Sequence, residues 1–262
     1  MSLAFLTPDV TRSRELHARS PMERPAAAAG ARFSRVEGWN VPNAYSEPSA
    51  EWARLTRTVG FLDRSSLSKL ELQADPRELA LIVAKASGEL AAHGQPADQS
   101  SGGGLVPELG RAGRSLLDAS GVWWCPVTPT RMLVLCEPAA ALAVRDALTR
   151  AAAAAQGTAT VIDVTCGLVA LALIGPAARE LLARFCAIDA RPALAPTGAF
   201  RPGSVARTPG YLLVEGHERL LVLVGWALGE YLWQVVADAA AALGGGPVGA
   251  EALSHLLERD DA

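Results

Sequence analysis

The sequence is poor in several features that mark common classes of protein. Its 262 residues include only four cysteines, Cys125, Cys136, Cys166 and Cys186, with no C-x-x-C pair and no histidine at metal-ligand spacing. A disulfide framework or a zinc site is therefore not expected. The cysteines are interpreted as four buried small hydrophobic residues of a protein from a reducing cytoplasm.

Charge and hydropathy exclude further classes. Charged residues make up 19% of the chain and the formal net charge is -3, without a dense run of lysine or arginine. Nucleic acid is therefore not an expected partner. The most apolar runs, at 168–174 and 220–228, are too short to cross a bilayer, so no membrane association is expected. Residues 1–19 form a predicted mobile arm that lacks the apolar segment of a secretory signal.

Motifs that would reveal a reaction are also missing. No nucleophile elbow, P-loop, dinucleotide glycine fingerprint or metal motif occurs in the sequence. His217 is the one histidine beside acids, Glu215 and Glu218, and this cluster is expected to lie in a solvated hairpin turn. Trp123 and Trp124 either line a ring-binding pocket or belong to the core or an interface, which is more common for paired tryptophans in an apolar strand.

The local patterns predict alternating strands and helices. The stretch 160–189 predicts two strands joined by a turn at 165–167, and then a helix that starts at Pro176, where a missing N–H costs nothing. Another helix is predicted to start after Asp75 as N-cap, and a flexible glycine-rich loop at 94–104 follows it. The order of the elements indicates two α+β units of similar build, without a repeat in the sequence.

Two sets of motifs resemble the glycine-cleavage T-protein (aminomethyltransferase) superfamily. Gly38-Trp-Asn-Val-Pro-Asn-Ala-Tyr45 and Gly60-Phe-Leu-Asp-Arg-Ser65 match, in order and spacing, the Gly-Trp-x-x-Pro-x-x-Tyr and Gly-aromatic-x-Asp-x-Ser segments of that family. The second half is more similar to one branch, the gamma subunit of heterotetrameric sarcosine oxidase. The matching segments there include Asp163-Val-Thr165, Gly175-Pro-Ala-Ala178 and Ala227-Leu-Gly-Glu-Tyr-Leu-Trp233.

The resemblance, which covers about residues 20–252, implies an α+β fold of the T-protein-like (aminomethyltransferase folate-binding) kind, with two intertwined subdomains. Residues 20–64 and 157–252 would form the first subdomain, and residues 65–156 would be inserted as the second. An acidic tail would occupy residues 253–262. The C-terminal barrel domain of T-proteins would be missing.

Departures from the T-protein pattern separate the branches. T-proteins have a catalytic aspartate shortly after an Asn-x-Ser-Gly turn, which Asp118-Ala-Ser-Gly121 resembles. Residues 122–130 contain no carboxylate that could stabilise a developing iminium, so the resemblance implies no catalytic residue. In the folate motif of T-proteins a tyrosine and a glutamate contact the ligand. Tyr211 and Glu218 stand at those positions and are the candidate folate contacts, although the middle of the motif has become apolar.

The leading interpretation is a non-catalytic, structural gamma subunit of a sarcosine-oxidase-type complex. In that family the complex oxidatively demethylates sarcosine and transfers the one-carbon unit to tetrahydrofolate. FAD, FMN and NAD are expected only on larger flavoprotein partner subunits, and tetrahydrofolate is the one cofactor considered for this chain. Trp123-Trp124 and residues 220–226 are the expected apolar surfaces for such a partner. The alternatives are a free-standing aminomethyltransferase-like or folate-binding protein, and a structural module without a ligand.

Overall fold

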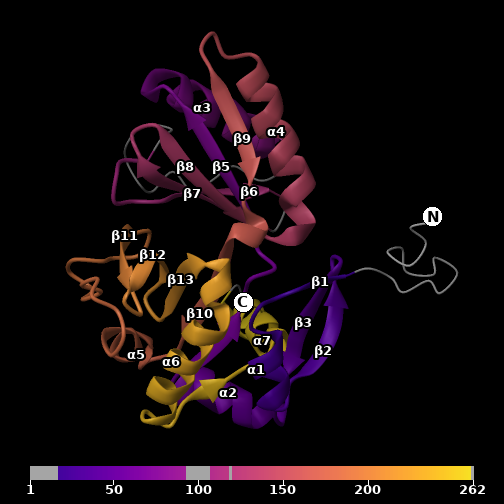
Figure 1. The fold of residues 1–262 in the computed structure, drawn as a ribbon, viewed down its shortest axis with the longest axis vertical. Coiled ribbons are helices and arrows are strands. Elements are labelled where there is room, and N and C mark those ends of the chain that lie inside the picture. The colour runs from indigo at the N-terminus through magenta and orange to yellow at the C-terminus, as the bar shows by residue number, and fades with distance from the viewer. Residues whose placement is uncertain (1–16, 93–106, 118–119, 261–262) are drawn as a thin grey trace, which may run out of the picture.

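The computed structural model describes residues 17–92, 107–117 and 120–260, which form two larger sheets, one small sheet and surrounding helices. The five-stranded sheet with its two helices forms the upper half of the molecule in Figure 1, and the six-stranded sheet forms the lower half. The predicted arm and the glycine-rich loop at 94–104 lie outside the described residues for the most part, since only residues 17–19 of the arm are described.

The five-stranded sheet is built from one continuous segment of the chain. Its order is β6-β7-β8-β5-β9, and every neighbouring pair is antiparallel. Helices α3 and α4 cover one face over a core of alternate strand residues, among them Leu70, Leu72 and Val134. The elements are β5 (Ser68–Ala74), α3 (Pro76–Ala92), β6 (Gly113–Leu117), β7 (Ser120–Thr128), β8 (Arg131–Cys136), α4 (Ala141–Ala153) and β9 (Ala159–Asp163).

The six-stranded sheet combines an early strand with the second half of the chain. Its order is β11-β12-β13-β10-β4-β14, antiparallel except for the β4–β14 pair. Helices α1 (Glu23–Ala28), α5 and α6 pack on its outer face. The other elements are β4 (Gly60–Asp63), β10 (Leu168–Ile174), α5 (Ala178–Ala183), β11 (Phe200–Val205), β12 (Thr208–Gly216), β13 (Arg219–Gly225), α6 (Gly229–Ala241) and β14 (Gly246–Pro247).

The two sheets follow the same plan. The elements of the five-stranded unit, taken along the chain, are β5, α3, β6, β7, β8, α4 and β9. Their counterparts in the six-stranded unit, in the same order, are β10, α5, β11, β12, β13, α6 and β4. The two long hairpins agree in detail: each closes through a two-residue turn, with Thr128 opposite Arg131 and Gly216 opposite Arg219. Each hairpin also has a register shift immediately before its turn. The two units of similar build predicted from the order of elements therefore share one strand arrangement.

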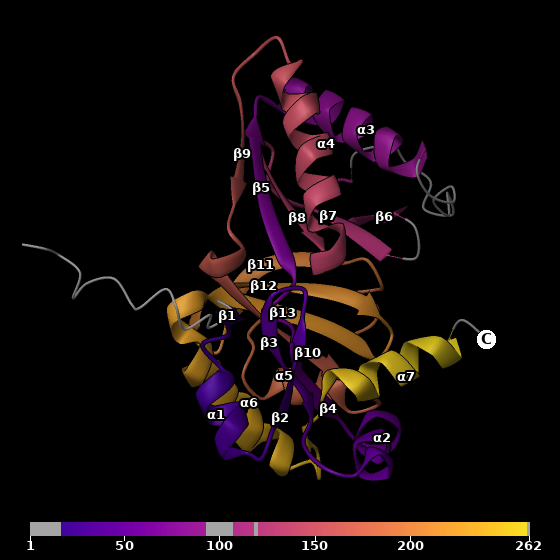
Figure 2. The ribbon, with the colours of Figure 1, turned by 90° about the vertical axis from the view of Figure 1, so that its right-hand side faces the viewer.

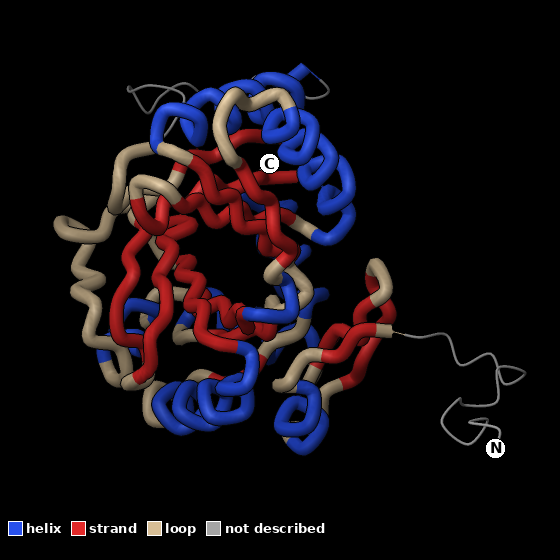
Figure 3. The backbone as a smooth tube through the Cα atoms, turned by 45° about the horizontal axis from the view of Figure 1, so that its top comes forward, coloured by secondary structure: helices blue, strands red, loops and turns tan. Residues whose placement is uncertain are grey.

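The inner faces of the sheets meet in a third core. Figure 3 shows the strands of the two sheets facing each other between outer layers of helices. Leu133 and Leu135 of β8 pack there with Leu221 and Leu223 of β13, away from the helices. The central strands β10 and β13 thus have their even and odd residues in different cores, which gives nearly continuous apolar runs such as 168–174.

A small sheet and two helices complete the lower half, with α7 beside α2 in Figure 2. Glu51 fastens this region: its carboxylate, only 2% exposed, accepts the N–H groups of Tyr45 (2.6 Å), Ser46 (2.7 Å) and Gly249 (2.7 Å). Glu51 therefore joins α2 to the end of β3 and to the start of α7. The elements are β1 (Ala18–Arg19), β2 (Arg32–Val36) and β3 (Trp39–Ala44), in the order β1-β3-β2, with α2 (Pro48–Arg57) and α7 (Ala250–Asp260).

The chain crosses between the two larger sheets twice, and Lys69 joins both crossings. Its Nζ donates to the carbonyl oxygens of Ser65 (2.8 Å) and Leu67 (2.8 Å) in the first crossing, and of Thr165 (3.3 Å) in the second. The Thr165 hydroxyl in turn accepts the N–H of Lys69 at 3.1 Å. Lys69 is fully buried, so these carbonyls take the place of water around the ammonium group.

The structure confirms the strands and the turn predicted for 160–189, as β9, a 3-10 turn at Thr165–Gly167 and β10. The following helix starts at Ala178 rather than Pro176. The helix predicted after Asp75 is α3, and the Asp75 carboxylate accepts the N–H of Arg77 at 3.1 Å. β9 pairs with β5, so the chain leaves the five-stranded sheet only after Asp163, whereas the sequence had placed residues from 157 onward in the first subdomain.

The segment 253–262, expected as an acidic tail, is helical as far as Asp260, where it continues α7. The expected apolar partner surfaces and the expected burial of all four cysteines are corrected. The apolar segment 220–226 offers little surface, because β13 lies between two other strands and Leu220–Val224 is buried on both faces. Trp124 is likewise buried, and its indole N–H donates to the Ser115 hydroxyl. Of the four cysteines, Cys166 is exposed in the turn between the sheets.

Burial makes the free energy of unfolding depend on the charge of Lys69. Desolvation, opposed mainly by the nearby Asp63, lowers the pKa of Lys69 from 10.5 to about 8. Between these values the unfolded chain binds more protons than the folded chain. We therefore expect Lys69 to contribute a rise of about 2 kcal/mol to the free energy of unfolding from pH 8 to pH 10. Cys125, Cys136 and Cys186 act in the opposite direction over this range, because burial raises the pKa of each thiol and the unfolded thiols lose their protons first. Above pH 10 the raised pKa of Tyr45 opposes this rise, because the unfolded tyrosine then loses its proton first.

Urea unfolding of the full chain at several pH values measures this dependence. The variant Lys69→Met has no group that titrates at this position, so its free energy of unfolding should gain about 2 kcal/mol less between pH 8 and pH 10 than that of the unchanged chain. Lys85→Met, which changes an exposed lysine of α3, should follow the unchanged chain. The same pH dependence in both variants would contradict the assignment to Lys69.

Candidate functional site

A pocket of about 780 Å³ opens where the two larger sheets meet. Its size is typical of small-molecule sites, which run from about 300 to 1,000 Å³. Both sheets contribute to its walls, and residues of β2, β3 and α7 complete them. The apolar part of the lining comes from the core between the sheets and includes Leu62, Leu67, Leu135, Ile174 and Leu221.

Arg64 is the central charged residue of this pocket. It follows β4, and its guanidinium pairs with the Glu137 carboxylate at the end of β8 and lies 3.9 Å from the Glu215 carboxylate on β12. The side chains of Arg64 and Glu215 are only 15% and 14% exposed. Because Glu137 belongs to the five-stranded sheet and Glu215 to the six-stranded sheet, one guanidinium joins the two halves of the molecule across the pocket.

A second arginine, Arg114, lies at the pocket on an aromatic ring. Arg114 of β6 and Trp123 of β7 are directly opposite in the antiparallel pair. The guanidinium carbon lies 5.5 Å from the centre of the Trp123 indole, within the range of a cation–π contact. Trp123 therefore contributes to the pocket wall, as the ring-binding interpretation of the paired tryptophans proposed, whereas Trp124 belongs to the core.

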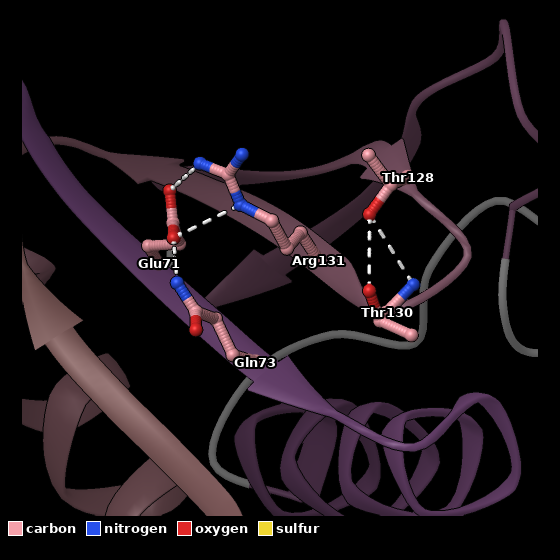
Figure 4. Close-up of polar contacts among 5 residues, drawn as sticks. All are labelled: Glu71, Gln73, Thr128, Thr130 and Arg131. Atoms are coloured by element: carbon pink, nitrogen blue, oxygen red, sulfur yellow. Dashed lines mark hydrogen bonds and ion pairs between the residues drawn. The ribbon is translucent and has the colours of Figure 1, made fainter.

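The pocket wall has a corresponding position in the other half of the molecule, and polar side chains fill that position. The matching hairpins make Arg131 the counterpart of Arg219 and Tyr211 the counterpart of Trp123. Figure 4 shows the Arg131 guanidinium paired with the Glu71 carboxylate, through Nε to Oε1 (3.1 Å) and Nη2 to Oε2 (2.6 Å), while Gln73 donates to the same carboxylate. These hydrogen bonds hold the pKa of Glu71 below its usual value.

The sequence explains why the position at Trp123 and Arg219 is open, whereas the corresponding position at Tyr211 and Arg131 is closed. Glu71 lies opposite Leu133 in the five-stranded sheet, and the corresponding residue opposite Leu221 is Ala172. A methyl group thus stands where the other half has a carboxylate that binds its arginine. Tyr211, the counterpart of Trp123, also has a partner, because it stacks on Phe200 with ring centres 5.5 Å apart and planes 14° apart.

The two predicted folate contacts are not brought together at the pocket. Tyr211 and Glu218 are both absent from its lining, and Glu218 lies in the exposed turn between β12 and β13. The five residue steps from Tyr211 to Gly216 alone span roughly 17 Å of extended strand. The carbonyl oxygen of Glu218 accepts the N–H of Gly175 at 2.9 Å, which fixes the turn to the end of β10.

Glu215 is the acid of this hairpin that reaches the pocket, and the folate motif of T-proteins does not identify it. Strand alternation carries the signal that would have found it, because Tyr211 and Leu213 already face the core between the sheets and the next residue on that side is Glu215. Glu137 and Arg114 belong to no motif, and Arg64 occupies an unspecified position of the Gly-aromatic-x-Asp-x-Ser segment. Their convergence depends on sheet pairing across long stretches of chain.

Asp63, in the middle of the family signature, borders the pocket, but its side chain does not point into the core between the sheets. It alternates with Leu62, so its side chain lies with that of Phe61 on the helix-covered side of β4. Asp63 is 4% exposed and its Oδ1 accepts the N–H of Ser65 at 2.9 Å, whereas Oδ2 makes no hydrogen bond of normal geometry. Burial raises the pKa of this carboxyl, and the hydroxyls of Ser20 and Ser65 partly offset the rise.

Two other kinds of site were sought within the described residues. In that part of the chain no group of histidine, cysteine, aspartate or glutamate side chains could hold a metal ion. No helix of the described segments is long and apolar enough to span a membrane.

Solved structures resemble this chain, although no protein-family model and no curated protein sequence matches it. The glycine cleavage system aminomethyltransferase T from Bartonella henselae superposes with a TM-score of 0.69 and 17% identity over 90% of this chain. The chain spans 60% of the length of that aminomethyltransferase. A chain of the heterotetrameric sarcosine oxidase from Corynebacterium sp. U-96, solved in complex with pyrrole 2-carboxylate, superposes with a TM-score of 0.59 and 23% identity.

At these identities the likeness establishes the fold. The chain has the T-protein-like fold, as the resemblance predicted, in its mixed α and β composition and in its arrangement of sheets. The matched share of each chain adds to this likeness. The chain of the sarcosine oxidase is matched over 96% of its own length and 86% of this chain, so the two are similar in extent as well as in fold.

The bridge between the sheets through Arg64 can be measured by a double-mutant cycle. We expect the variants Arg64→Gln, Glu137→Gln and the double variant to give a coupling energy of about 1 kcal/mol, since the Arg64 side chain is largely shielded from water and Glu137 is half-exposed. Urea unfolding of the four proteins measures it. The exposed pair Arg184–Glu180 on one helix is the matched control and should give about 0.3 kcal/mol. Equal couplings for the two pairs would contradict the bridging role.

Proposed function

We propose that this chain is a non-catalytic, gamma-type subunit of a sarcosine-oxidase-type complex. The observation that carries the proposal is the match to a chain of a heterotetrameric sarcosine oxidase over 96% of that chain. FAD, FMN and NAD would be held by larger flavoprotein partners, in the cytoplasm. The established activity of such a complex, oxidative demethylation of sarcosine with transfer of the one-carbon unit to tetrahydrofolate, would then belong to the assembly.

The side chains after the Asp118-to-Gly121 motif support a non-catalytic role. Residues 122–130 form β7 and its turn, and they carry no carboxylate into the pocket. The acids that do reach the pocket near Arg64 are Glu137 and Glu215, and their charges are balanced by its guanidinium. A carboxylate held in this way is poorly suited to stabilise a cationic transition state.

The surface sets a condition on the proposed assembly. Because β13 and Trp124 are buried, a partner would have to bind other parts of the molecule than the apolar segments predicted from the sequence. The exposed large hydrophobic residues among those described are distributed over several elements, on α3, α4, α6, β2, β9 and two loops. A partner interface would therefore combine such residues with polar ones, as stable interfaces generally do.

Co-expression with the larger flavoprotein subunits of a sarcosine-oxidase-type complex tests the subunit role. We expect the chain to co-purify with them and to elute with them in size-exclusion chromatography as one flavin-containing species. A matched control is the same chain purified alone and mixed with an unrelated flavoprotein, which should elute separately. Elution of the co-expressed chain as a lone monomer would overturn the proposal.

A second candidate function, that of a folate-binding or aminomethyltransferase-like protein, is favoured by the open pocket between the sheets and by the likeness to an aminomethyltransferase. Tetrahydrofolate would then bind this chain itself. Tyr211 and Glu218 remain the residues proposed to contact it, although neither lines the pocket in this structure.

Titration with 5-formyltetrahydrofolate tests the second function. Saturable binding that weakens about tenfold or more in Tyr211→Phe and in Glu218→Gln is its expected result, because each variant removes one hydrogen-bonding group. Tyr231→Phe is the matched control, since the Tyr231 hydroxyl donates only to the Ala206 carbonyl oxygen. Binding that is unchanged in both site variants would rule out these two residues as contacts, and no binding at all would exclude the function.

A further inference from the structure

We infer that the outer edge of the five-stranded sheet, strand β9, pairs with the same edge of a second copy of this chain, antiparallel and centred on Val161. The five-stranded sheets of the two copies would then form one continuous sheet across a twofold axis. The inference goes beyond the proposed subunit role and needs neither a partner subunit nor a ligand. It rests on the outward-facing main chain of β9, on the protection of other sheet edges and on the way the strand complements itself.

Strand β9 ends the five-stranded sheet on an open side. Figure 2 shows β9 at the outer margin of this sheet, beyond β5. No other strand and no isolated β-bridge of the described residues pairs with its outer side. The strand also lacks the features that usually protect an edge, since it contains no proline, no lysine and no bulge. Its main chain is therefore available to another strand.

A hydrogen bond just beyond β9 fixes which of its residues face outward. The N–H of Val164 donates to the Lys69 carbonyl oxygen of β5 at 2.9 Å, and these two residues continue the register of the β5–β9 pair. Along an antiparallel pair, residues that bond to the neighbour alternate with residues that do not. Every second residue of β9 therefore directs its N–H and C=O toward the open side. These residues are Ala159, Val161 and Asp163.

The far side of β5 gives the same assignment. Ala74 of β5 lies opposite Ala159, and its N–H donates to the Thr130 carbonyl oxygen at 3.1 Å, on the side of β8. Since Ala74 bonds to the β8 side, it does not bond to β9. Its partner Ala159 therefore faces the open edge, in agreement with the first assignment.

The corresponding edge in the other half of the molecule is closed. β4 is the counterpart of β9, and its outer side pairs in parallel with β14. The opposite end of the six-stranded sheet is protected as well, because β11 contains Pro202 and its Val205 is bridged to Cys186. The fold thus accepts an added strand beside β4, and β9 presents the same position without one.

A second copy of β9 fits this edge along its whole length. Antiparallel pairing centred on Val161 places Val161 opposite itself and Thr160 opposite Ile162, and such β-branched residues pack well across strands. Asp163, the charged residue of the strand, then lies opposite Ala159, so no like charges meet. All the outward N–H and C=O groups of β9 are paired in this register, whereas any shifted register leaves some of them unpaired.

The contact is expected to be weak, because a strand of this length gives a small interface. Helix α4 packs on β9, so the α4 helices of the two copies would lie near the axis and add to the contact. Two of the exposed large hydrophobic side chains, Leu142 of α4 (60% exposed) and Ile162 of β9 (39% exposed), belong to these two elements. Association of two copies would therefore reduce the apolar surface of both elements.

Sedimentation equilibrium of the full chain, purified alone, tests the association. The average mass should rise from that of one copy toward that of two as the protein concentration is raised to about 100 μM, which is sufficient for a weak interface. Val161→Pro removes an N–H that makes no bond to β5, so this variant should stay folded and monomeric. Val161→Thr keeps the N–H and a β-branched side chain, and should associate as the unchanged chain does. Circular dichroism checks the fold of both variants.

Cysteine cross-linking tests the register. Residues 160 and 162 of opposite copies would form a non-hydrogen-bonded pair with Cα atoms about 4.5 Å apart, within the roughly 4.4–6.8 Å that a disulfide bridges. The variants Thr160→Cys and Ile162→Cys are made in a Cys166→Ser background, which removes the exposed cysteine. On oxidation, an equal mixture of the two variants should give a covalent dimer. Each variant alone should give much less, because identical positions would lie diagonally, about 7–8 Å apart.

Four results would overturn the inference. The first is a chain that stays monomeric at every concentration. The second is undiminished association of a folded Val161→Pro variant, since the contact would then lie elsewhere. The third is as much covalent dimer from either cysteine variant alone as from the mixture. The fourth is a monomeric chain that binds flavoprotein subunits and loses them in Val161→Pro, because the edge would then take a strand of the partner.

Discussion

The arrangement of this protein depends on how two sheets that share one chain are held at the points where the chain passes between them. Lys69 contacts both passages. Three main-chain carbonyl oxygens surround its ammonium group in place of water. The sequence contains only two lysines among its 24 basic residues, so arginine serves almost every other cationic position. A compact ammonium suits a space enclosed by carbonyls, whereas a planar guanidinium suits a bidentate carboxylate such as Glu71.

Two halves with the same strand plan have acquired different inner surfaces. Where the five-stranded sheet presents Glu71 to its arginine, the six-stranded sheet presents Ala172, and the aromatic counterparts are a stacked Tyr211 and an accessible Trp123. One position is therefore closed by an ion pair and an aromatic stack, and the other is open. The difference rests on a few side chains, since the strand order and even the register shifts of the hairpins agree.

The sequence predicts local structure here better than it predicts the pocket. The strands of 160–189, the cap at Asp75 and the two similar units follow from short-range patterns. The lining of the pocket does not, because Arg64, Glu137 and Glu215 lie 73 and 78 residues apart and meet through sheet pairing. Glu218, which motif spacing selects as a ligand contact, lies in the turn after the register shift of β12 and does not line the pocket. The apolar run of β13 fits a surface patch or a central strand equally well on composition alone.

The position of β4 has a consequence for the order in which the chain can fold during synthesis. The five-stranded sheet comes from one continuous segment, 68–163, and can close as soon as that segment has emerged from the ribosome. β4 precedes it, yet both neighbours of β4 in the sheet, β10 and β14, are made more than 100 residues later. The signature strand that contains Asp63 must therefore wait, unpaired, until β10 has been made. Its apolar residues are exposed to chaperones and to other nascent chains in the meantime.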